Sequence, residues 1–234
     1  MKNYSTVEKI KLLFTYTSYL IFLCFIGYLI ISEKNYVTYL FIVFAIFALV
    51  ASVYYETLKV KYHKALYALN FELNSDKALD LYEDLLKKDY LRGYQKTKIL
   101  FYLQYYTEKQ DAHKMLEILN ENQKELRKGL YMLSILYYYQ LRACFINQDV
   151  DSITEVYNKI LELRKTRKNP KLFNPLEIDG MYYLVINHRK KAYTCFKNIN
   201  MKNMNPKERR FIFENLIVLA KDEKEKKEYQ KQII

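Results

Sequence analysis

The side chains that most often carry catalysis or hold metals are few and scattered in this sequence. Its three histidines are His63, His113 and His188, and no cluster of His, Cys, Asp and Glu has the spacing of a metal site. The chain lacks Gly-x-Ser-x-Gly, a phosphate-binding loop and a dinucleotide-binding fingerprint. We therefore expect no catalytic residue, no metal and no cofactor, and a protein that is not an enzyme and takes no small-molecule substrate.

The cysteines show no pairing pattern either. Cys24 lies inside an apolar run, Cys144 and Cys195 are far apart, and no Cys-x-x-Cys occurs. Three thiols without a pairing pattern suit a reducing compartment and do not form a disulfide framework.

Two uncharged apolar runs near the N-terminus determine how the chain is organised. They cover residues 12–32 and 36–55, with only Glu33, Lys34 and Asn35 between them. A bilayer core of about 30 Å is crossed by roughly 20 apolar residues in a helix, and backbone groups in lipid must be satisfied within that helix. We predict a transmembrane helical hairpin over residues 1–56, with the lipid bilayer as a partner.

Two alternatives for these runs are disfavoured by their pattern. A signal peptide has an apolar region of about 7–15 residues before a small-residue cleavage site, whereas the first run is longer and ends in Ile-Ile-Ser-Glu. A buried hairpin in a soluble core normally shows one polar face, and neither run has one.

Cations beside the runs predict the orientation of the hairpin. Only Lys34 lies between the runs, and the flanking cations are Lys2, Lys9, Lys11, Lys59, Lys61 and Lys64. Cytoplasmic flanks collect Lys and Arg. We expect an integral protein of a bacterial plasma membrane with both termini in the cytoplasm.

The remaining residues, 57–234, read as one cytoplasmic all-α domain. The whole chain has only four glycines and three prolines, which favours long helices over sheets. Hydrophobic periodicity and cap residues predict helices at 57–73, 77–88, 94–108, from 111, 130–146, 150–165, 176–186, 189–199 and 206–220, then a charged helix, with a loop at 166–175.

The predicted helices form pairs that share a pattern. The second helix of each pair opens at Ala78, Ala112, Ile153 or Ala192, and four positions later stand Tyr82, Leu116, Tyr157 and Phe196. The first two openings are 34 residues apart.

This pattern resembles the tetratricopeptide repeat, a 34-residue helix pair. The closest match is residues 147–163, and Gly180 and Tyr183 stand at family positions of the fourth pair. Departures are Leu66, Leu100 and Leu141 where the family prefers Gly or Ala, and a missing proline after each second helix. The resemblance covers about residues 59–200 and implies an α-solenoid of four to five helix pairs with capping helices; an irregular helical bundle is the alternative.

In that family the first helix of each pair lines a concave binding surface. The resemblance therefore implies a partner-binding groove formed by Tyr67, Asn70, Phe71, Tyr94, Phe101, Gln104, Tyr105, Tyr138, Arg142, Phe145, Glu177 and Met181. Aromatic residues and Arg are the usual anchors of interfaces. With 25 tyrosines in the chain, half or more of its aromatic side chains are expected to be structural.

Basic clusters leave several partners open. They contain Arg164, Lys165, Arg167, Lys168 and Lys171, then Arg189, Lys190 and Lys191, then Lys207, Arg209 and Arg210. Such clusters contact anionic lipid, an acidic partner or nucleic acid, or remain a solvated surface. The solvated surface is favoured, and no nucleic-acid module frames the clusters.

These features favour a membrane-anchored scaffold or adaptor whose groove binds a protein or peptide. The alternative is a small accessory subunit of a membrane complex, such as a secretion or export assembly, or an immunity-type membrane protein, in which the hairpin is the active part.

Overall fold

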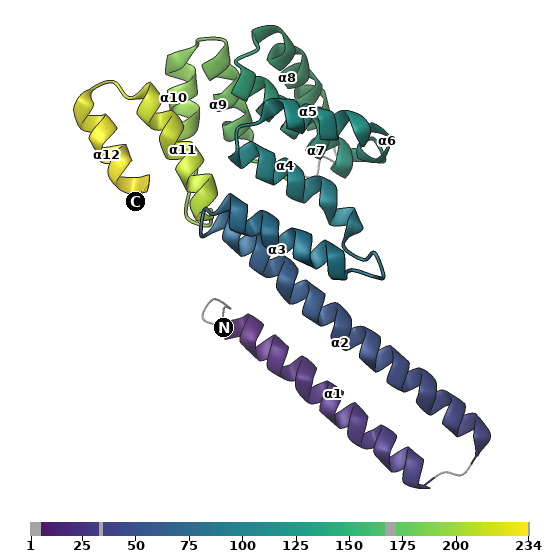
Figure 1. The fold of residues 1–234 in the computed structure, drawn as a ribbon. Helices are drawn as coiled ribbons and strands as arrows, with labels where there is room; N and C mark the ends of the chain where they lie inside the picture. The colour runs from purple at the N-terminus through teal and green to yellow at the C-terminus, as the bar shows by residue number, and fades with distance from the viewer. Residues whose placement is uncertain (1–5, 33–34, 167–171, 234) are drawn as a thin grey trace. The chain divides into compact units, whose positions relative to one another are not determined.

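The computed structural model describes residues 6–32, 35–166 and 172–233 (Figure 1). Within these ranges the secondary structure consists of twelve α-helices and one 3-10 turn, without strands, so the predicted all-α class is confirmed. The chain divides into two compact units, residues 1–60 and 61–234. We call them the hairpin unit and the helical domain; helix α2 contributes residues to both.

The hairpin unit contains α1 (Thr6–Ser32) and the first part of α2 (Tyr36–Asn70). The two helices meet through Ile26, Ile42 and Ala45. In the most apolar window of each helix only 6% and 11% of the residues are buried, unlike a core helix of a soluble protein. Both helices are long and apolar enough to cross a membrane.

Several hydroxyl groups of the hairpin unit donate hydrogen bonds within their own helices. Thr17, Ser18 and Ser52 each donate to the carbonyl four residues earlier, at 2.8–2.9 Å. A helix in lipid must satisfy its polar groups in this internal way. Lys2 and Lys34, and the side chains of Lys9 and Lys11, lie outside the described residues.

The helical domain continues from the last turns of α2 through ten further helices. They are α3 (Ser75–Lys88), α4 (Lys98–Glu108), α5 (Ala112–Glu121), α6 (Gln123–Leu126), α7 (Leu130–Asn147), α8 (Val150–Lys165), α9 (Pro175–Val185), α10 (Arg189–Lys197), α11 (Pro206–Leu219) and α12 (Glu223–Ile233). The predicted helices are confirmed, with small differences. The predicted start at 94 is a 3-10 turn, η1 (Gln95–Thr97), and the short α6 was not predicted.

Helix starts are fixed by local caps. Asn and Asp side chains accept backbone N–H groups of the first turn, and these caps are Asn74, Asp111, Asp149, Asn174 and Asn205. At Asn205 the cap is a full capping box with Glu208, and Pro206 takes the first helical position.

A residue with left-handed backbone follows each first helix. These positive-φ residues are Leu73, Gln110, Gln148 and Asn187, at intervals of 37, 38 and 39 residues; Arg92 and Gly129 also have positive φ but lie elsewhere. At Gln110, Gln148 and Asn187, the N–H of the next residue bonds a carbonyl five residues back, at 2.8–3.0 Å, which is the Schellman pattern. The domain is therefore built from four structurally similar helix pairs: the end of α2 with α3, α4 with α5, α7 with α8, and α9 with α10.

The pairs stack in chain order, and their buried apolar residues include one cluster over α4 to α7 and another over α7 to α11. Besides the contacts within pairs, α5 packs on α7, α8 on α9, and α10 on α11. Ala78, Ile153 and Ala192, which open second helices, are fully buried, and Ala112 nearly so. A Cβ on Gly180 would stand 2.9 Å from the ring of Phe196, so α9 and α10 meet closely at this glycine.

Candidate functional site

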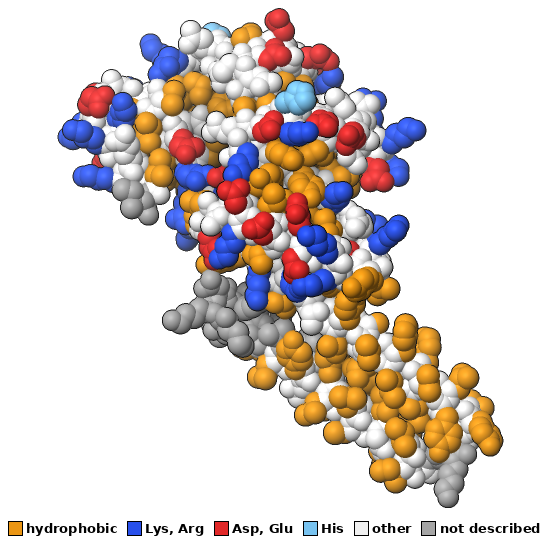
Figure 2. Space-filling view, in the orientation of Figure 1, with side chains coloured by type: hydrophobic (Ala, Val, Ile, Leu, Met, Phe, Trp, Pro, Cys, Tyr) orange, Lys and Arg blue, Asp and Glu red, His pale blue; other side chains and the backbone are white. Residues whose placement is uncertain are grey.

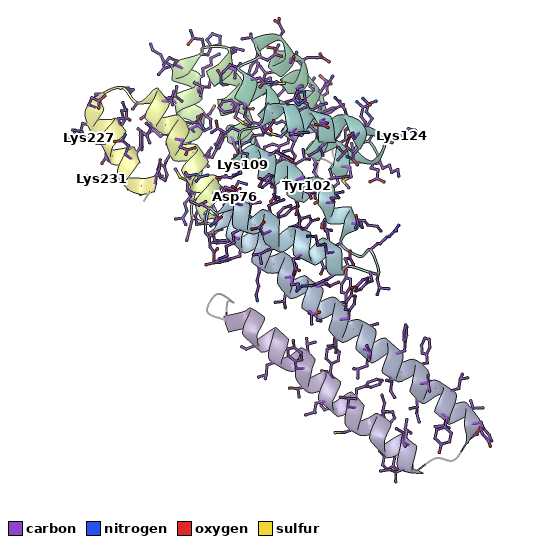
Figure 3. All side chains as sticks on the ribbon, in the orientation of Figure 1. Asp76, Tyr102, Lys109, Lys124, Lys227 and Lys231 are labelled. Atoms are coloured by element: carbon purple, nitrogen blue, oxygen red, sulfur yellow. The ribbon has the colours of Figure 1, made fainter. Side chains whose placement is uncertain are left out.

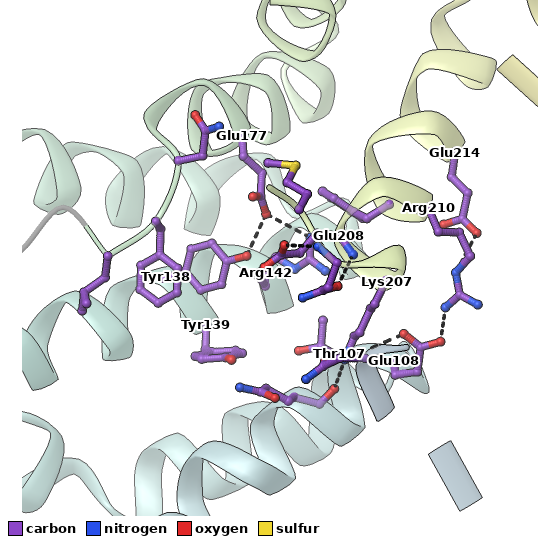
Figure 4. Close-up of a pocket in the computed structure, with 18 of the residues that line it drawn as sticks. Thr107, Glu108, Tyr138, Tyr139, Arg142, Glu177, Lys207, Glu208, Arg210 and Glu214 are labelled. Atoms are coloured by element: carbon purple, nitrogen blue, oxygen red, sulfur yellow. Dashed lines mark hydrogen bonds and ion pairs between the residues drawn. The ribbon is translucent and has the colours of Figure 1, made fainter. Parts of the chain in front are cut away.

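A cavity of about 370 Å³ lies among the first helices of successive pairs (Figure 4). Its wall comes from helices α2 (its end), α4, α7, α9 and α11. The loop after α4 and the loops before α9 and α11 complete it. The lining residues are Asn70, Gln104, Thr107, Glu108, Gln110, Tyr138, Tyr139, Arg142, Leu172, Phe173, Asn174, Glu177, Met204, Asn205, Lys207, Glu208, Arg210, Phe211 and Glu214.

A buried polar cluster joins α7 to α9 in this wall. The Tyr138 hydroxyl donates to Glu177 Oε1 at 2.7 Å, and Arg142 Nη1 lies 3.6 Å from the same oxygen. The side chains of Arg142 and Glu177 are only 11% and 13% exposed. The Arg142 guanidinium also lies over the Phe211 ring, 3.8 Å from its centroid, which is a cation–π contact from α11.

Burial shapes the protonation of this cluster. It raises the pKa of Glu177, and the charge of Arg142 and the hydrogen bond from Tyr138 oppose the rise. Burial also raises the pKa of Tyr138 well above its usual value, with Glu177 adding to the effect. Tyr138 is therefore held as a neutral donor. Among the described residues, Arg142 Nε is one of two buried side-chain polar atoms without a hydrogen-bond partner.

A second cluster joins α11 to α4. Lys207 Nζ donates to the Gln104 carbonyl at 2.9 Å and lies 3.8 Å from Glu108 Oε2. Arg210 pairs with the same Glu108 and lies 3.6 Å from Glu214. Burial lowers the pKa of Lys207 to about 8, and the Glu108 charge opposes the drop. Two cations of α11 thus meet one carboxylate of α4 at this edge of the cavity.

The structure brings together five of the residues predicted for the groove. Asn70, Gln104, Tyr138, Arg142 and Glu177 all line the cavity, and they come from the first helices of four pairs.

Three other predicted residues lie in or beside the core. Phe101 is buried and stacks on Tyr82 at 3.8 Å. Met181 is also buried, although Arg142 Nη1 reaches its sulfur at 3.8 Å. Phe145 meets the Phe211 ring edge-on at 5.9 Å, behind the cavity wall.

The predicted residues of the first two pairs are spread over several contacts. Tyr67 stacks on the exposed Phe71 at 5.1 Å. Tyr94 is buried against Tyr62 of α2. Tyr105 lies under Lys109 Nζ at 5.8 Å.

Lys109 is itself held in place by an ion pair. It pairs with Asp76 at 2.7 Å (Figure 3), which links α3 to the end of α4. Tyr105 therefore contributes to the packing between the first two pairs.

Cations near the end of the hairpin unit pair with acids in the same or the following helix. Lys59 pairs with Glu56 at 3.2 Å, and Lys61 with Asp84 of α3 at 2.8 Å. Lys64 is exposed.

Several cations of the basic clusters have structural partners. Arg164 pairs with Asp179 at 2.7 Å, and Arg189 donates to the Val218 carbonyl at 2.5 Å. Arg167, Lys168 and Lys171 lie outside the described residues. A solvated surface therefore accounts for only part of these clusters.

Sequence reasoning missed the contribution of α11 to the cavity. The sequence places Lys207 and Arg210 in a basic cluster and gives no signal for a role of Phe211, Glu214 or Glu108. The capping box and Pro206 signalled the start of α11, but nothing local indicated that its first turn contacts α4, about one hundred residues earlier.

Within the described residues, no group of three or more His, Cys, Asp or Glu side chains could hold a metal ion. No protein-family model, curated protein or solved structure matches the chain.

Proposed function

We propose that this chain is a membrane-anchored scaffold whose first-helix surface binds a protein or peptide partner. The observation that carries the proposal is the cavity shared by four helix pairs and α11. Its lining mixes aromatic rings with four carboxylates and three cations. Partner surfaces use the same combination of aromatic and Arg anchors.

The recurring pairs support a tetratricopeptide-like solenoid for the helical domain. Four residues with left-handed backbone repeat at nearly constant intervals. The close approach of Gly180 to Phe196 joins two positions at which the sequence resembles the family. Solenoids of this kind present the first helices of their pairs along one extended surface.

The apolar hairpin unit supports the membrane anchor. Its two helices are long enough to span a bilayer, and most of their large apolar side chains are exposed. Burying these side chains in lipid would remove an apolar surface that soluble proteins rarely leave open. The anchor then keeps the helical domain attached to the membrane.

Cross-linking from inside the cavity tests partner binding. A photo-cross-linking side chain replaces Asn70 in the cavity wall of the full-length protein, and a matched variant carries it at Glu155, an exposed position of α8. We expect cross-linked partners from membranes at position 70 and none of them at position 155. The same partners at both positions, or none at position 70, would contradict the proposal.

A charge variant gives a second readout of the same site. Asn70→Arg places a large cation in the cavity, so pull-down of the partner should fall, whereas Glu155→Arg should leave it unchanged. Thermal unfolding of both variants shows whether the fold has been kept. If a folded Asn70→Arg variant recovered as much partner as the unchanged protein, the cavity would not be the binding site.

The outward apolar surface of the hairpin unit also favours the second candidate, a subunit whose spans contact other membrane proteins. Exchanging residues 12–55 for an unrelated two-span anchor separates the two proposals. A scaffold keeps its partner and its activity in the cell after the exchange. A membrane-complex subunit or immunity-type protein loses its activity.

A further inference from the structure

The connection between α3 and α4 displays two apolar side chains at its tip. Tyr90 is 81% exposed and Leu91 is 66% exposed. They are the central residues of a β-turn closed by the Arg92 N–H donating to the Asp89 carbonyl at 3.1 Å. Large apolar side chains at a turn tip are unusual in a soluble domain, where turns favour polar residues, Gly and Pro.

Hydrogen bonds and burial fix the conformation of this turn. Asp89 is only 5% exposed, and its carboxylate accepts the N–H groups of Gly93 and Tyr94 at 2.9 and 2.7 Å. Tyr94 in turn is buried against Tyr62 of α2, with ring centroids 5.3 Å apart. A buried carboxylate and a buried aromatic ring thus hold Tyr90 and Leu91 outward, so their exposure is part of the fold.

Cations surround the displayed pair. The exposed ones within residues 87–98 are Lys87, Lys88, Arg92, Lys96 and Lys98. Of these, Lys88 pairs with Asp84 at 2.6 Å, and Lys98 Nζ lies over the Tyr102 ring at 5.9 Å. The single acid of this segment is Asp89, whose oxygens are already engaged. Figure 2 shows apolar side chains next to Lys and Arg side chains over the connection between α3 and α4.

We propose that residues 87–98 form a membrane-docking turn that inserts Tyr90 and Leu91 among the headgroups of an anionic bilayer. Lys87, Arg92 and Lys96 would contact lipid phosphates. Tyrosine is favoured at the membrane–water interface, and an apolar tip ringed by Lys and Arg is the composition of surfaces that bind anionic lipid.

The inference rests on the proposed membrane anchor but does not depend on partner binding in the cavity. Tyr62, which packs against the turn, follows Tyr55, the last residue of the second apolar run, by only seven residues in α2. A protein tethered at that point presents the turn to lipid at high effective concentration. An acidic protein or a nucleic acid would also satisfy the cations, but the short separation along α2 between Tyr62 and the second apolar run favours lipid.

The absence of tryptophan from the chain gives a direct test. Leu91→Trp makes a single fluorescent reporter in the full-length protein. The protein is placed in nanodiscs of phosphatidylcholine alone, or of phosphatidylcholine and phosphatidylserine in a three-to-one ratio, with brominated acyl chains as quencher. Val150→Trp at the exposed start of α8 is the matched control.

We expect Leu91→Trp emission to shift to the blue and to be quenched in anionic discs, at least about twofold more than in neutral discs. Added salt should reduce the difference, because it screens surface charge. The Val150→Trp control should show no quenching in either disc. Adding Lys87→Gln, Arg92→Gln and Lys96→Gln to the Leu91→Trp variant should abolish the preference for anionic lipid.

Three outcomes would overturn the proposal. One is an unquenched Leu91→Trp in both discs, and another is quenching that ignores both lipid charge and the three Gln substitutions. The third is an emission shift with a single-stranded RNA but not with lipid, which would make the turn a nucleic-acid surface. Failure of the anchor itself is distinguishable, because a protein without membrane spans would not enter nanodiscs at all.

Discussion

The hairpin unit and the helical domain use the same apolar side chains in opposite places. Phe44 in α2 is 69% exposed, whereas Phe196 in α10 is completely buried. In the helical domain, apolar residues face other helices and charged residues form the outer surface and part of the cavity. The number of apolar residues in a helix therefore does not tell whether the helix lies in lipid or in a water-soluble domain. Whether these side chains face outward or toward other helices does tell.

The polar side chains of the two units differ in the same way. Hydroxyls of the hairpin unit bond to their own helix, as at Thr17 and Ser52. In the helical domain, charged side chains bridge different helices, as Glu108 does to Lys207. The bonds of these hydroxyls thus stay within one helix, whereas the Glu108–Lys207 pair joins helices about one hundred residues apart in the chain.

The largest expected effect comes from truncating the same residue type in both units. Phe196→Ala removes a buried ring next to Gly180 and should lower the free energy of unfolding of the helical domain by about 3–5 kcal/mol. Phe44→Ala should change it by less than about 0.5 kcal/mol, because the Phe44 side chain is exposed within its unit. Denaturant unfolding of the purified chain in detergent, followed by circular dichroism, measures both.

This pair of variants can break the comparison. If Phe44→Ala destabilised the helical domain as much as Phe196→Ala, the two units would share one core. The opposite placement of apolar side chains in the two units would then be wrong. An unchanged membrane fraction for Phe196→Ala shows that the anchor does not depend on the core of the domain.

Helix positions could be predicted from the sequence because their signals are local. Caps such as Asp111, Asp149 and Asn205 bond to N–H groups three residues away, so the sequence nearby contains both partners. The left-handed residues Gln110 and Gln148 were not predicted, since neither is the glycine that such a position favours.

The cavity was predicted only in part because its geometry is not local. Projecting the first helix of each predicted pair onto one surface predicts Tyr138, Arg142 and Glu177, and all three line the cavity. Phe101 and Met181 came from the same projection but are buried, because a residue pattern does not fix the rotation of each helix against its neighbours. The reach of α11 to α4 depends on how every intervening pair stacks.

A smaller effect is expected from the two helical glycines, one in each unit. A Cβ at position 180 would stand 2.9–3.0 Å from three atoms of the Phe196 ring, whereas nothing lies within 4 Å of one at position 27. Gly180→Ala should therefore destabilise the helical domain by about 1–3 kcal/mol through overpacking. Gly27→Ala should leave that stability unchanged, since Ala is the better helix former by about 1 kcal/mol and meets no neighbour.

A double variant shows whether the Gly180→Ala effect arises from contact with the Phe196 ring. Adding Phe196→Leu to Gly180→Ala should give less destabilisation than the two single effects added together, because the two sites touch. Strict additivity would show that the Gly180 effect does not arise from the Phe196 ring.

The smallest expected effect is a pH dependence of stability caused by the buried amine of Lys207. The apolar spans contain no charged side chain that could cause such a dependence. Burial holds the pKa of Lys207 at about 8 in the folded chain, against an ordinary value of 10.5. Between these values the unfolded chain binds more protons than the folded chain, so the contribution of Lys207 to stability rises as pH increases.

From pH 7 to pH 9 the wild type should gain about 1 kcal/mol relative to Lys207→Met, which keeps the apolar stem but cannot titrate. Measuring the difference between the two proteins cancels groups they share, such as Cys144, whose pKa burial raises to about 11. A constant difference across this range would mean that Lys207 reaches water, and that the polar interior of the helical domain is as open at this edge as the lysine-rich surface around it.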